Sequence, residues 1–272
     1  MANPTVRWIG DPALLPRIAV VTPAFNHRDY IEAALHSVLC QGYPNLEYVV
    51  MDGGSTDGSA EIIARHGDYL AHHESHPDGG PYDAVQGGFA RTTGEIMLWL
   101  NADDMLHRNA LWTLAQVFLD LPQVDWIMGL PTGLDPAGRT YFVRSKSRWS
   151  RLRYLRGDYG TIQQESVAWR RRLWERAGGR LDPRYHLAAD MELWMRFFRH
   201  ARLHTVAAPI GGFRRLAGQR SERGRAQYHR ECAEIIAREP RSAADAAALS
   251  RLRRFERLWL RVPFVRRSWR VR

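Results

Sequence analysis

The first candidates for chemistry are two adjacent carboxylates, Asp103 and Asp104. They follow the apolar run Glu95–Leu100. A buried strand that carries acids at its carboxyl end is how an open α/β sheet presents charge to a ligand or cation. The alternative is that both acids cap a helix that begins near Asn109. By itself, the motif Asn101-Ala102-Asp103-Asp104 does not decide between a metal site and a helix cap.

Two glycine-rich turns place further acids after predicted strands. The first, Asp52-Gly53-Gly54-Ser55-Thr56-Asp57-Gly58, combines glycines that allow close approach with a carboxylate, Asp52, that can accept hydrogen bonds from a nucleoside. Asp57 is explained by helix capping, whereas Asp52 is not. The second turn, from Pro77 to Ala84, contains Asp78 and Asp83, and its alternative is an ordinary loop. Neither turn has a dinucleotide fingerprint or a phosphate loop that ends in Gly-Lys-Ser/Thr.

A third candidate lies on the helix expected from Leu187 to Arg202. Its first turn contains Asp190 and Glu192, which point roughly 200° apart on a helix and so cannot share one task. Asp190 is either a partner of the helix dipole or a general base, a role that needs only one carboxylate near a substrate hydroxyl.

The elements that must position these acids alternate between strands and helices. Apolar runs predict strands over residues 17–22, 46–51, 69–74 and 95–100. Helical spacing predicts one helix over 30–41, a second from the turn that ends at Gly58 to about Arg65, and a third over 82–91. This alternation implies an open, mostly parallel α/β sheet with helices on both faces, so the strand ends should meet at one edge. The later chain is less regular. It predicts helices near 108–119, 187–202, 223–237 and 243–260, a strand near 126–129, and a turn-rich stretch to about 160.

The composition is that of a folded protein, and most of its net positive charge lies near the C-terminal end of the sequence. Of the 272 residues, 45% are hydrophobic, and no apolar run reaches the roughly 20 residues of a membrane span, so we expect a cytoplasmic protein. Cys40 and Cys232 have no metal-binding spacing and are expected as thiols. The net charge is +10, but residues 251–272 hold nine Arg and one Glu, which leaves 10 − 8 = +2 for the rest. A nucleic-acid groove across the fold is therefore poorly supported.

The basic tail has three interpretations. Its arginines alternate with apolar and aromatic residues, as in a helix that lies on an anionic membrane, here the inner face of the cell membrane. The alternatives are a solvated helix whose aromatics pack on the body and, with less support, an RNA-binding segment. We expect one domain over residues 1–240, with halves at about 17–104 and 105–240, a linker at 239–242, and a basic amphipathic helical extension over 241–272.

In this order, the segments resemble the family 2 glycosyltransferases with the GT-A fold. The matching segments are Val21-Thr22-Pro23-Ala24-Phe25-Asn26, Ser37 to Glu47, Asp52 to Gly58, Pro77 to Ala84 and Asn101 to Asp104. Further on, Gln163-Gln164-Glu165, Ala189 to Phe197 and Gly212-Phe213-Arg214 are similar to acceptor-side signatures of bacterial polysaccharide members. The resemblance covers about residues 17–221.

The resemblance implies an inverting transferase that moves a sugar from a nucleotide sugar, first of all a UDP-sugar, to a glycan or lipid-linked acceptor in cell-surface polysaccharide synthesis such as that of O-antigen. It implies Mg²⁺ or Mn²⁺ on Asp103 with Asp104 in support, and Asp190 as the base. The implied contacts to the donor are Thr22, Pro23, Phe25, Asn26, Asp52, Asp78, Asp83, Asn101, Ala102 and Asp103.

The chain also departs from the family pattern. Position 101 is Asn where relatives often have an acid, and Gln86-Gly87-Gly88 replaces an Asn-x-Gly segment that contacts the donor. Leu216 stands where many members have a His ligand, so Arg214, Arg215 or Arg220 are the candidates to meet the phosphates. The alternative function is a non-catalytic protein that binds nucleotide sugars or acts as a membrane scaffold, which predicts disrupted acids.

Overall fold

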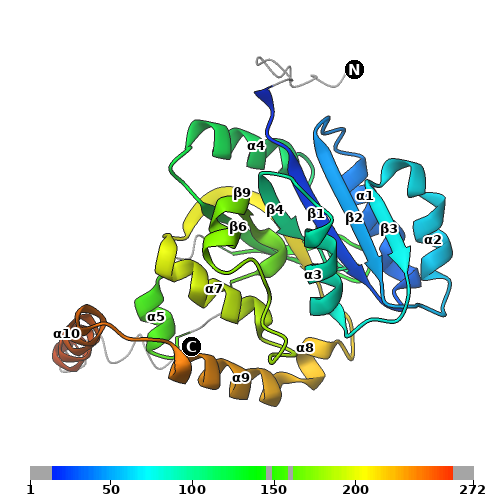
Figure 1. Cartoon of the computed structure of the whole chain (residues 1–272). Helices are drawn as coiled ribbons and strands as arrows, with labels where there is room; N and C mark the ends of the chain where they lie inside the picture. Colours follow the sequence, from blue (N-terminus) through cyan, green and yellow to red (C-terminus); the bar gives the residue numbers. More distant parts are fainter. Residues whose placement is uncertain (1–13, 145–148, 159–161, 260–272) are drawn as a thin grey trace.

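The computed structural model describes residues 14–144, 149–158 and 162–259 (Figure 1). Their strands form one nine-stranded sheet in the order β3-β2-β1-β4-β8-β6-β9-β5, with β7 paired to β6. The strands are β1 (Ile18–Ala24), β2 (Leu46–Asp52), β3 (His72–Ser75), β4 (Ile96–Trp99), β5 (Met105–Leu106), β6 (Trp126–Leu134), β7 (Thr140–Val143), β8 (Val167–Arg170) and β9 (His204–Arg214).

Helices connect these strands. They are α1 (Arg28–Leu39), α2 (Ser59–Arg65), α3 (Pro81–Ala90), α4 (Ala110–Asp120), α5 (Arg151–Leu155), α6 (Arg171–Arg176), α7 (Ala189–His200), α8 (Arg220–Arg223), α9 (Arg225–Arg238) and α10 (Ala243–Trp259). Two short 3₁₀ helices, η2 (Gly67–Tyr69) and η3 (Gln164–Ser166), also lie within the described residues.

The first half of the sheet is parallel, as the alternation of strands and helices predicts. β3, β2, β1 and β4 pair in parallel, and all seven residues of β1 are buried. The register pairs Ala24 with Asp52, which brings the carboxyl ends of β1 and β2 level. The loops that follow both strands therefore begin at the same edge.

The second half is mixed. β8 is antiparallel to both β4 and β6, whereas β6 and β9 are parallel. The sequence predicts only a short strand near Trp126, but β6 continues to Leu134, and β8 and β9 are not predicted at all. β9 contains Pro209 and two adjacent glycines, residues that weaken a strand signal, and its register with β6 shifts at two points.

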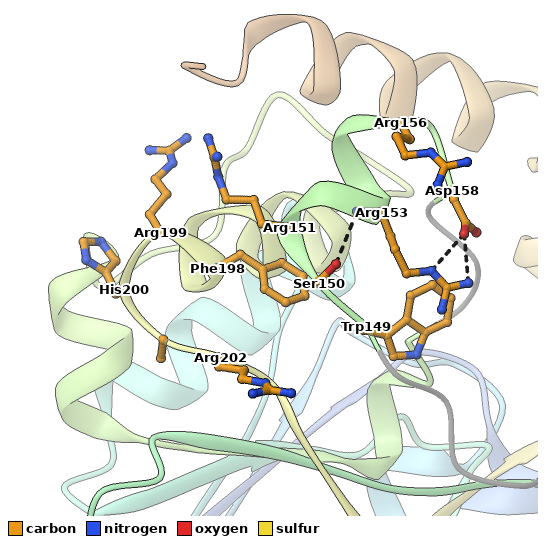
Figure 2. A pocket seen from close by; sticks show the side chains of 11 residues that line it. Trp149, Ser150, Arg151, Arg153, Arg156, Asp158, Phe198, Arg199, His200 and Arg202 are labelled. Carbon is orange, nitrogen blue, oxygen red and sulfur yellow. Dashed lines mark hydrogen bonds and ion pairs between the residues drawn. The ribbon is translucent and has the colours of Figure 1, made fainter. Parts of the chain in front are cut away.

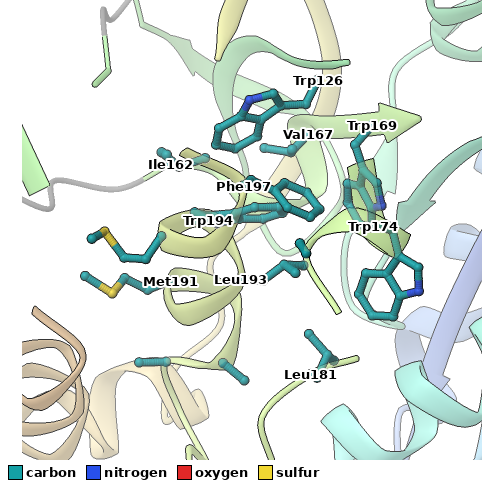
Figure 3. Close-up of a cluster of buried hydrophobic side chains, with 14 of the residues drawn as sticks. Trp126, Ile162, Val167, Trp169, Trp174, Leu181, Met191, Leu193, Trp194 and Phe197 are labelled. Carbon is teal, nitrogen blue, oxygen red and sulfur yellow. The ribbon is translucent and has the colours of Figure 1, made fainter. Parts of the chain in front are cut away.

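Two apolar layers enclose the sheet. One face packs against α1, α2 and α4, and the opposite face packs against α3, α5, α6, α7 and α9. Figure 1 shows α3 and α7 in front of the sheet. The second layer is built on indole rings: Trp126 and Trp194 stack with ring centroids 5.6 Å apart, and Trp169 lies edge-on to Trp194 at the same separation (Figure 3). This packing fixes α7, and thus its first turn, against the sheet.

Gly211 shows why β9 needs its glycines. A Cβ atom at this position would overlap the backbone carbonyl of Glu165 in η3. We expect Gly211→Ala to lower the free energy of unfolding by about 3 kcal/mol, because neither backbone can give way cheaply. Urea unfolding followed by tryptophan fluorescence measures this. Gly87→Ala is the matched control, since its Cβ would meet only the ends of two flexible side chains, Met51 at 3.3 Å and Arg91 at 3.4 Å. An equal loss in both variants would contradict the expected close packing of η3 on β9.

The C-terminal helix begins where the sequence predicts a break. α9 ends at Arg238 and α10 begins at Ala243. Glu239, in the expected linker, is 5% exposed and forms ion pairs with Arg151 and Arg199, so this segment is anchored to the body. Residues 260–272 of the predicted basic tail lie outside the described residues. Within the parts of the chain that are described, no helix combines the length and apolarity needed to cross a membrane.

Candidate active site

The two carboxylates after β4 have different environments. Asp104 is fully buried, and its oxygens accept hydrogen bonds from the backbone N–H of Arg214 at 2.8 Å and from the Asn101 amide at 3.0 Å. Asp103 is partly exposed and accepts one hydrogen bond, from the Gln219 amide, at 3.1 Å. None of these bonds goes to the start of α4, so helix capping does not explain the pair. Asp103 is the acid that faces outward, and Asp104 joins the strand end to β9.

Charge accumulates around these acids. Burial holds the pKa of Asp104 well above its usual range, and the charges of Glu165 and Asp103 act in the same direction. Several carboxylates that share a confined site repel one another, and a bound cation relieves that repulsion.

Glu165 ends the segment Gln163-Gln164-Glu165, which resembles an acceptor-side signature, but it is not among the predicted catalytic, donor or metal residues. It is 2% exposed, and its Oε1 atom has no hydrogen-bond partner among the described residues. Burial raises the pKa of Glu165 to about 8, and the charges of Asp103 and Asp190 add to the effect. Its position is fixed because Gln164 donates to the Trp99 carbonyl at 2.8 Å. The signal available in the sequence is the segment Gln163-Gln164-Glu165, which is separated from β8 by one residue, Ser166.

Asp190 lies in the first turn of α7, where the helix dipole and the backbone N–H groups of Asp190 and Met191 favour its charged form. The Glu231 carboxylate of α9 accepts hydrogen bonds from the backbone N–H groups of the two residues before the helix, Leu187 at 2.8 Å and Ala188 at 2.9 Å. The Oδ1 atom of Asp190 is buried and has no hydrogen-bond partner within the described chain. Asp190 can therefore be a partner of the helix dipole and still offer one oxygen to a substrate hydroxyl.

The electrostatics of Asp190 suit proton transfer. Burial raises the pKa of its carboxyl to about 6, with the charge of Glu231 adding to the shift. Glu192 pairs with Arg196 at 2.7 Å, a separate contact, as the helical spacing predicts. A carboxylate with a raised pKa and a free oxygen has the properties of a general base near neutral pH.

The glycine-rich turns meet each other at the neighbouring strand ends. Asp52 is 2% exposed and accepts hydrogen bonds from the Ser55 N–H at 2.9 Å and the Ser75 hydroxyl at 2.6 Å. A Cβ on Gly53 would lie 3.2 Å from the carboxylate oxygens of Asp78, so only glycine allows this approach without a shift. The convergence of the two turns, predicted from the strand order, is thus present.

The other acid of the second turn is engaged locally. Asp83 is exposed and accepts from the N–H of Gly79 at 3.1 Å, while Asp78 accepts from the N–H of Gly80 at 2.7 Å. Both acids therefore hold the shape of their own turn, and they lie beside the Asp52 loop.

Most of the remaining predicted donor residues lie at the end of β1 or directly after it. The Thr22 hydroxyl is buried and lies 3.0 Å from the phenol oxygen of Tyr48, and Pro23 is buried too, so neither side chain is open to solvent. Phe25 is 57% exposed.

Asn26 adopts a left-handed φ of 54° and accepts a hydrogen bond from the Thr56 N–H at 3.0 Å, which ties the segment after β1 to the Asp52 loop. Ala102 is fully buried between Asn101 and Asp103.

Arg214 meets the acidic site through its backbone N–H, while its guanidinium contacts other groups. It is 3% exposed, its guanidinium lies 5.0 Å from the centroid of the Tyr30 ring, and it donates to the Pro136 carbonyl at 3.0 Å. Its Nε and Nη2 atoms have no hydrogen-bond partner in the described residues. Arg220, the other candidate with a described contact, donates to the His186 carbonyl at 2.5 Å.

A basic pocket lies at the opposite end of α7. It has a volume of about 1070 Å³ and is lined by α5 and by the last turn of α7 (Figure 2). A rise of about 1.5 Å per residue puts the two ends of this 12-residue helix about 18 Å apart, so the pocket is remote from Asp190. Acids neutralise several of its arginines, including Arg151 by Asp245 at 2.5 Å and Arg199 by Glu239 at 2.5 Å. The pocket is not part of the acidic site.

Comparisons with known proteins identify a family. The family model described as Glycosyl transferase family 2 matches residues 19–173, more than half of the chain. A putative teichuronic acid biosynthesis glycosyltransferase, TuaG of Bacillus subtilis, is 33% identical over 104 residues, or 35% of this chain and 39% of that protein. An uncharacterized glycosyltransferase of Rickettsia typhi, RT0329, is 28% identical over 138 residues, or 50% of this chain and 43% of that protein. The matches thus span less than half the length of these relatives.

Solved structures share the fold. S. aureus TarS 1–349 in complex with UDP-GlcNAc superposes with a TM-score of 0.65 at 20% identity, covering 84% of this chain and 68% of that one. The mannosyltransferase PcManGT of Pyrobaculum calidifontis, in complex with GDP-Man and Mn²⁺, gives a TM-score of 0.63 at 22% identity, covering 88% of this chain and 69% of that one. The predicted GT-A fold is confirmed, and the chain belongs to glycosyl transferase family 2.

Proposed function

We propose that the protein transfers a sugar from a nucleotide-sugar donor, first of all a UDP-sugar, to a hydroxyl of a glycan or lipid-linked acceptor, with inversion at the anomeric carbon. The observation that carries the proposal is Asp190, whose free, buried oxygen shares an acidic site with Asp103 and Glu165. Its position on the second half of the chain separates the base from the loops of the first half, which we assign to the donor.

The residues at the strand end fit a hard divalent cation. Asp103 offers an outward-facing carboxylate, and the buried Oε1 atom of Glu165 nearby has no hydrogen-bond partner among the described residues. We assign Mg²⁺ or Mn²⁺ to Asp103, with Asp104 in support through its bonds to Asn101 and Arg214. The complex of PcManGT with Mn²⁺ supports this assignment. When bound, such an ion neutralises charge on the diphosphate of the donor.

The donor is assigned to the edge formed by β1, β2 and β4. Asp52 accepts from the base of the nucleotide, Asn101 lies near the ribose, and the exposed Phe25 ring offers an apolar surface beside the base. The segments that complete this proposed donor surface are those of Thr22, Pro23, Asn26, Asp78, Asp83, Ala102 and Asp103. Because the Thr22 hydroxyl is bonded to Tyr48, this residue contributes through its backbone.

The chemistry assigned to the chain's own groups is a single displacement. The acceptor oxygen attacks the anomeric carbon, its proton passes to a carboxylate oxygen of Asp190, and the bond from that carbon to the diphosphate oxygen breaks on the opposite face. The free Oδ1 atom supports this role because it has no other hydrogen bond to give up. Because the acceptor oxygen attacks once, on the face opposite the leaving diphosphate, the configuration of the anomeric carbon inverts.

The cellular setting is assigned from the tail and from one relative. We place the protein in the cytoplasm, attached peripherally to the inner face of the cell membrane through residues 251–272, which have a local charge of +8. The name of TuaG, with teichuronic acid biosynthesis, supports a role in cell-surface polysaccharide synthesis. α10 packs against α5, which sets the start of this basic segment beside the body.

Binding of nucleotide sugars tests the proposal. In a thermal-shift panel with Mn²⁺, we expect a UDP-sugar to raise the unfolding midpoint, since a ligand of the folded state stabilises it by mass action. The panel includes UDP-GlcNAc, UDP-glucose, UDP-galactose, GDP-mannose and dTDP-rhamnose, each with Mn²⁺ or with EDTA. A donor that shifts the midpoint only with Mn²⁺ supports the proposal. No shift with any donor would contradict it.

A further inference from the structure

A second cluster of potential metal ligands lies on the opposite layer, between α1 and α2. It consists of Glu32, His36 and His66, whose ligand atoms all lie within 4.8 Å of one another. Glu32 and His36 are one helical turn apart on α1, and His66 follows the last residue of α2. The cluster contains two imidazoles, whereas the site at Asp103 consists of carboxylates.

The geometry of the two histidines fits one shared ion. Their Nε2 atoms are 3.1 Å apart, with the ring planes inclined at 66°. Two imidazole nitrogens at about 2.0–2.1 Å from one Zn²⁺ ion, with a tetrahedral angle between them, would be about 3.3 Å apart. An ion thus requires only a small adjustment of either ring.

A hydrogen bond sets the tautomer of His66. Its Nδ1 atom lies 2.9 Å from the backbone carbonyl of Ile62, which can only accept, so Nδ1 carries the proton. The Nε2 lone pair of His66 therefore points at the cluster. A carbonyl that orients a histidine through its other nitrogen is the usual outer partner of a metal ligand. On metal binding, His36 keeps its proton on Nδ1 or releases one to solvent, and its Nε2 atom then binds the ion.

The helices are otherwise tied at their other ends. Backbone N–H groups at the start of α1 donate to side chains that precede or begin α2: Arg28 donates to Asp57 at 2.9 Å, and His27 donates to Ser59 at 2.9 Å. The cluster lies farther along both helices. An ion there would hold the end of α2 against α1 and would stabilise the folded chain by mass action.

We propose that Glu32, His36 and His66 form a site for a divalent transition metal of the Zn²⁺ class, separate from the ion assigned to Asp103. Two imidazoles and one carboxylate are a ligand set typical of Zn²⁺, with water in the fourth position, and imidazole selects against Mg²⁺. The assignment does not depend on the reaction that the protein performs.

Zinc binding to the full chain, free of any added histidine tag, tests the proposal. All variants carry Asp103→Asn, so that an ion at the other candidate site does not contribute to the number of bound Zn²⁺ ions. Each variant has one further substitution: His36→Ala, Glu32→Gln or, as the matched control, His204→Ala, which removes an exposed histidine at the start of β9. Zn²⁺ is titrated against a chromophoric chelator, and Co²⁺ reports a low-symmetry site through its visible absorption.

We expect the background chain and the His204→Ala control to bind one Zn²⁺ with the same affinity. His36→Ala should weaken that affinity at least about tenfold, because even the loss of an outer partner costs 10–100-fold. Glu32→Gln should weaken it as well, and the Co²⁺ absorption should disappear in His36→Ala. Unchanged affinity in His36→Ala, or no bound Zn²⁺ in the background chain, would overturn the proposal and leave a hydrogen bond between two histidines.

Discussion

The substitution Asp190→Asn is expected to lower the rate of sugar transfer about 10³-fold, the usual range for loss of a general base, while donor affinity stays unchanged. The amide keeps the shape of the side chain but cannot take the acceptor proton. The Glu231 carboxylate holds the segment just before α7 through the N–H groups of Leu187 and Ala188, contacts that this substitution leaves in place. The variant should therefore fold, and its defect should appear in kcat measured at saturating donor.

Glu192→Gln is the matched control for this prediction. It removes an acid two residues farther along the same helix, where the carboxylate pairs with Arg196. Transfer by this variant should stay within a few-fold of the wild type. Near-wild-type kcat in Asp190→Asn would assign the base to another group.

The pH dependence of transfer follows from the same carboxyl group. A base must be ionised, and burial favours its neutral form, which raises the pKa of Asp190 to about 6. Transfer should therefore rise with pH through about 6 and level off above it. Asp190→Asn should lack this acidic limb when kcat is measured from pH 5 to 8. An identical limb in both enzymes would show that another group titrates.

Asp103→Asn is the second substitution with a large expected effect, and it acts on the donor. Removing the charge should weaken Mn²⁺-dependent donor binding at least about 100-fold, or about 2.7 kcal/mol, since electrostatic neutralisation of a diphosphate contributes several kcal/mol. Titration calorimetry with the UDP-sugar and Mn²⁺ measures this loss.

The control for the donor-binding experiment is Asp120→Asn. This acid ends α4 on the surface and accepts only from the Gln116 side chain among its described contacts, at 2.8 Å. Its loss should leave donor affinity unchanged. If Asp103→Asn bound the donor as tightly as this control does, the assignment of the ion to Asp103 would be wrong.

The first half of the fold could be predicted because its elements are short and regular. β1, β2 and β4 are compact apolar runs, and the helices between the strands have apolar residues at helical spacing, whereas the edge strand β3 (His-His-Glu-Ser) is polar and only partly overlaps the predicted strand over 69–74. β9 could not be predicted, because its glycines are chosen for close approach to η3 and not for strand propensity. β8 is only four residues long, too short for its pattern to be told from a buried helix.

The site follows the same division. Asp52, Asp103 and Asp190 could be proposed from the sequence because each acid ends or follows a strand or opens a helix. The environments of Glu165 and Glu231 could not be predicted, because the charges of Asp103 and Asp190 act on Glu165, and that of Glu231 acts on Asp190, across long distances in sequence. The difference between Asp103 and Asp104 also depends on tertiary structure, since a backbone N–H of β9 occupies one oxygen of Asp104.

The central claim is a division of labour between the ion site at Asp103 and the base at Asp190. Its most direct test is one calorimetric comparison of UDP-sugar binding, in Mn²⁺, by the wild type, Asp190→Asn and Asp103→Asn. The proposed mechanism predicts wild-type affinity for Asp190→Asn and a loss of at least about 100-fold for Asp103→Asn. Equal weakening of donor binding in the two variants would contradict it.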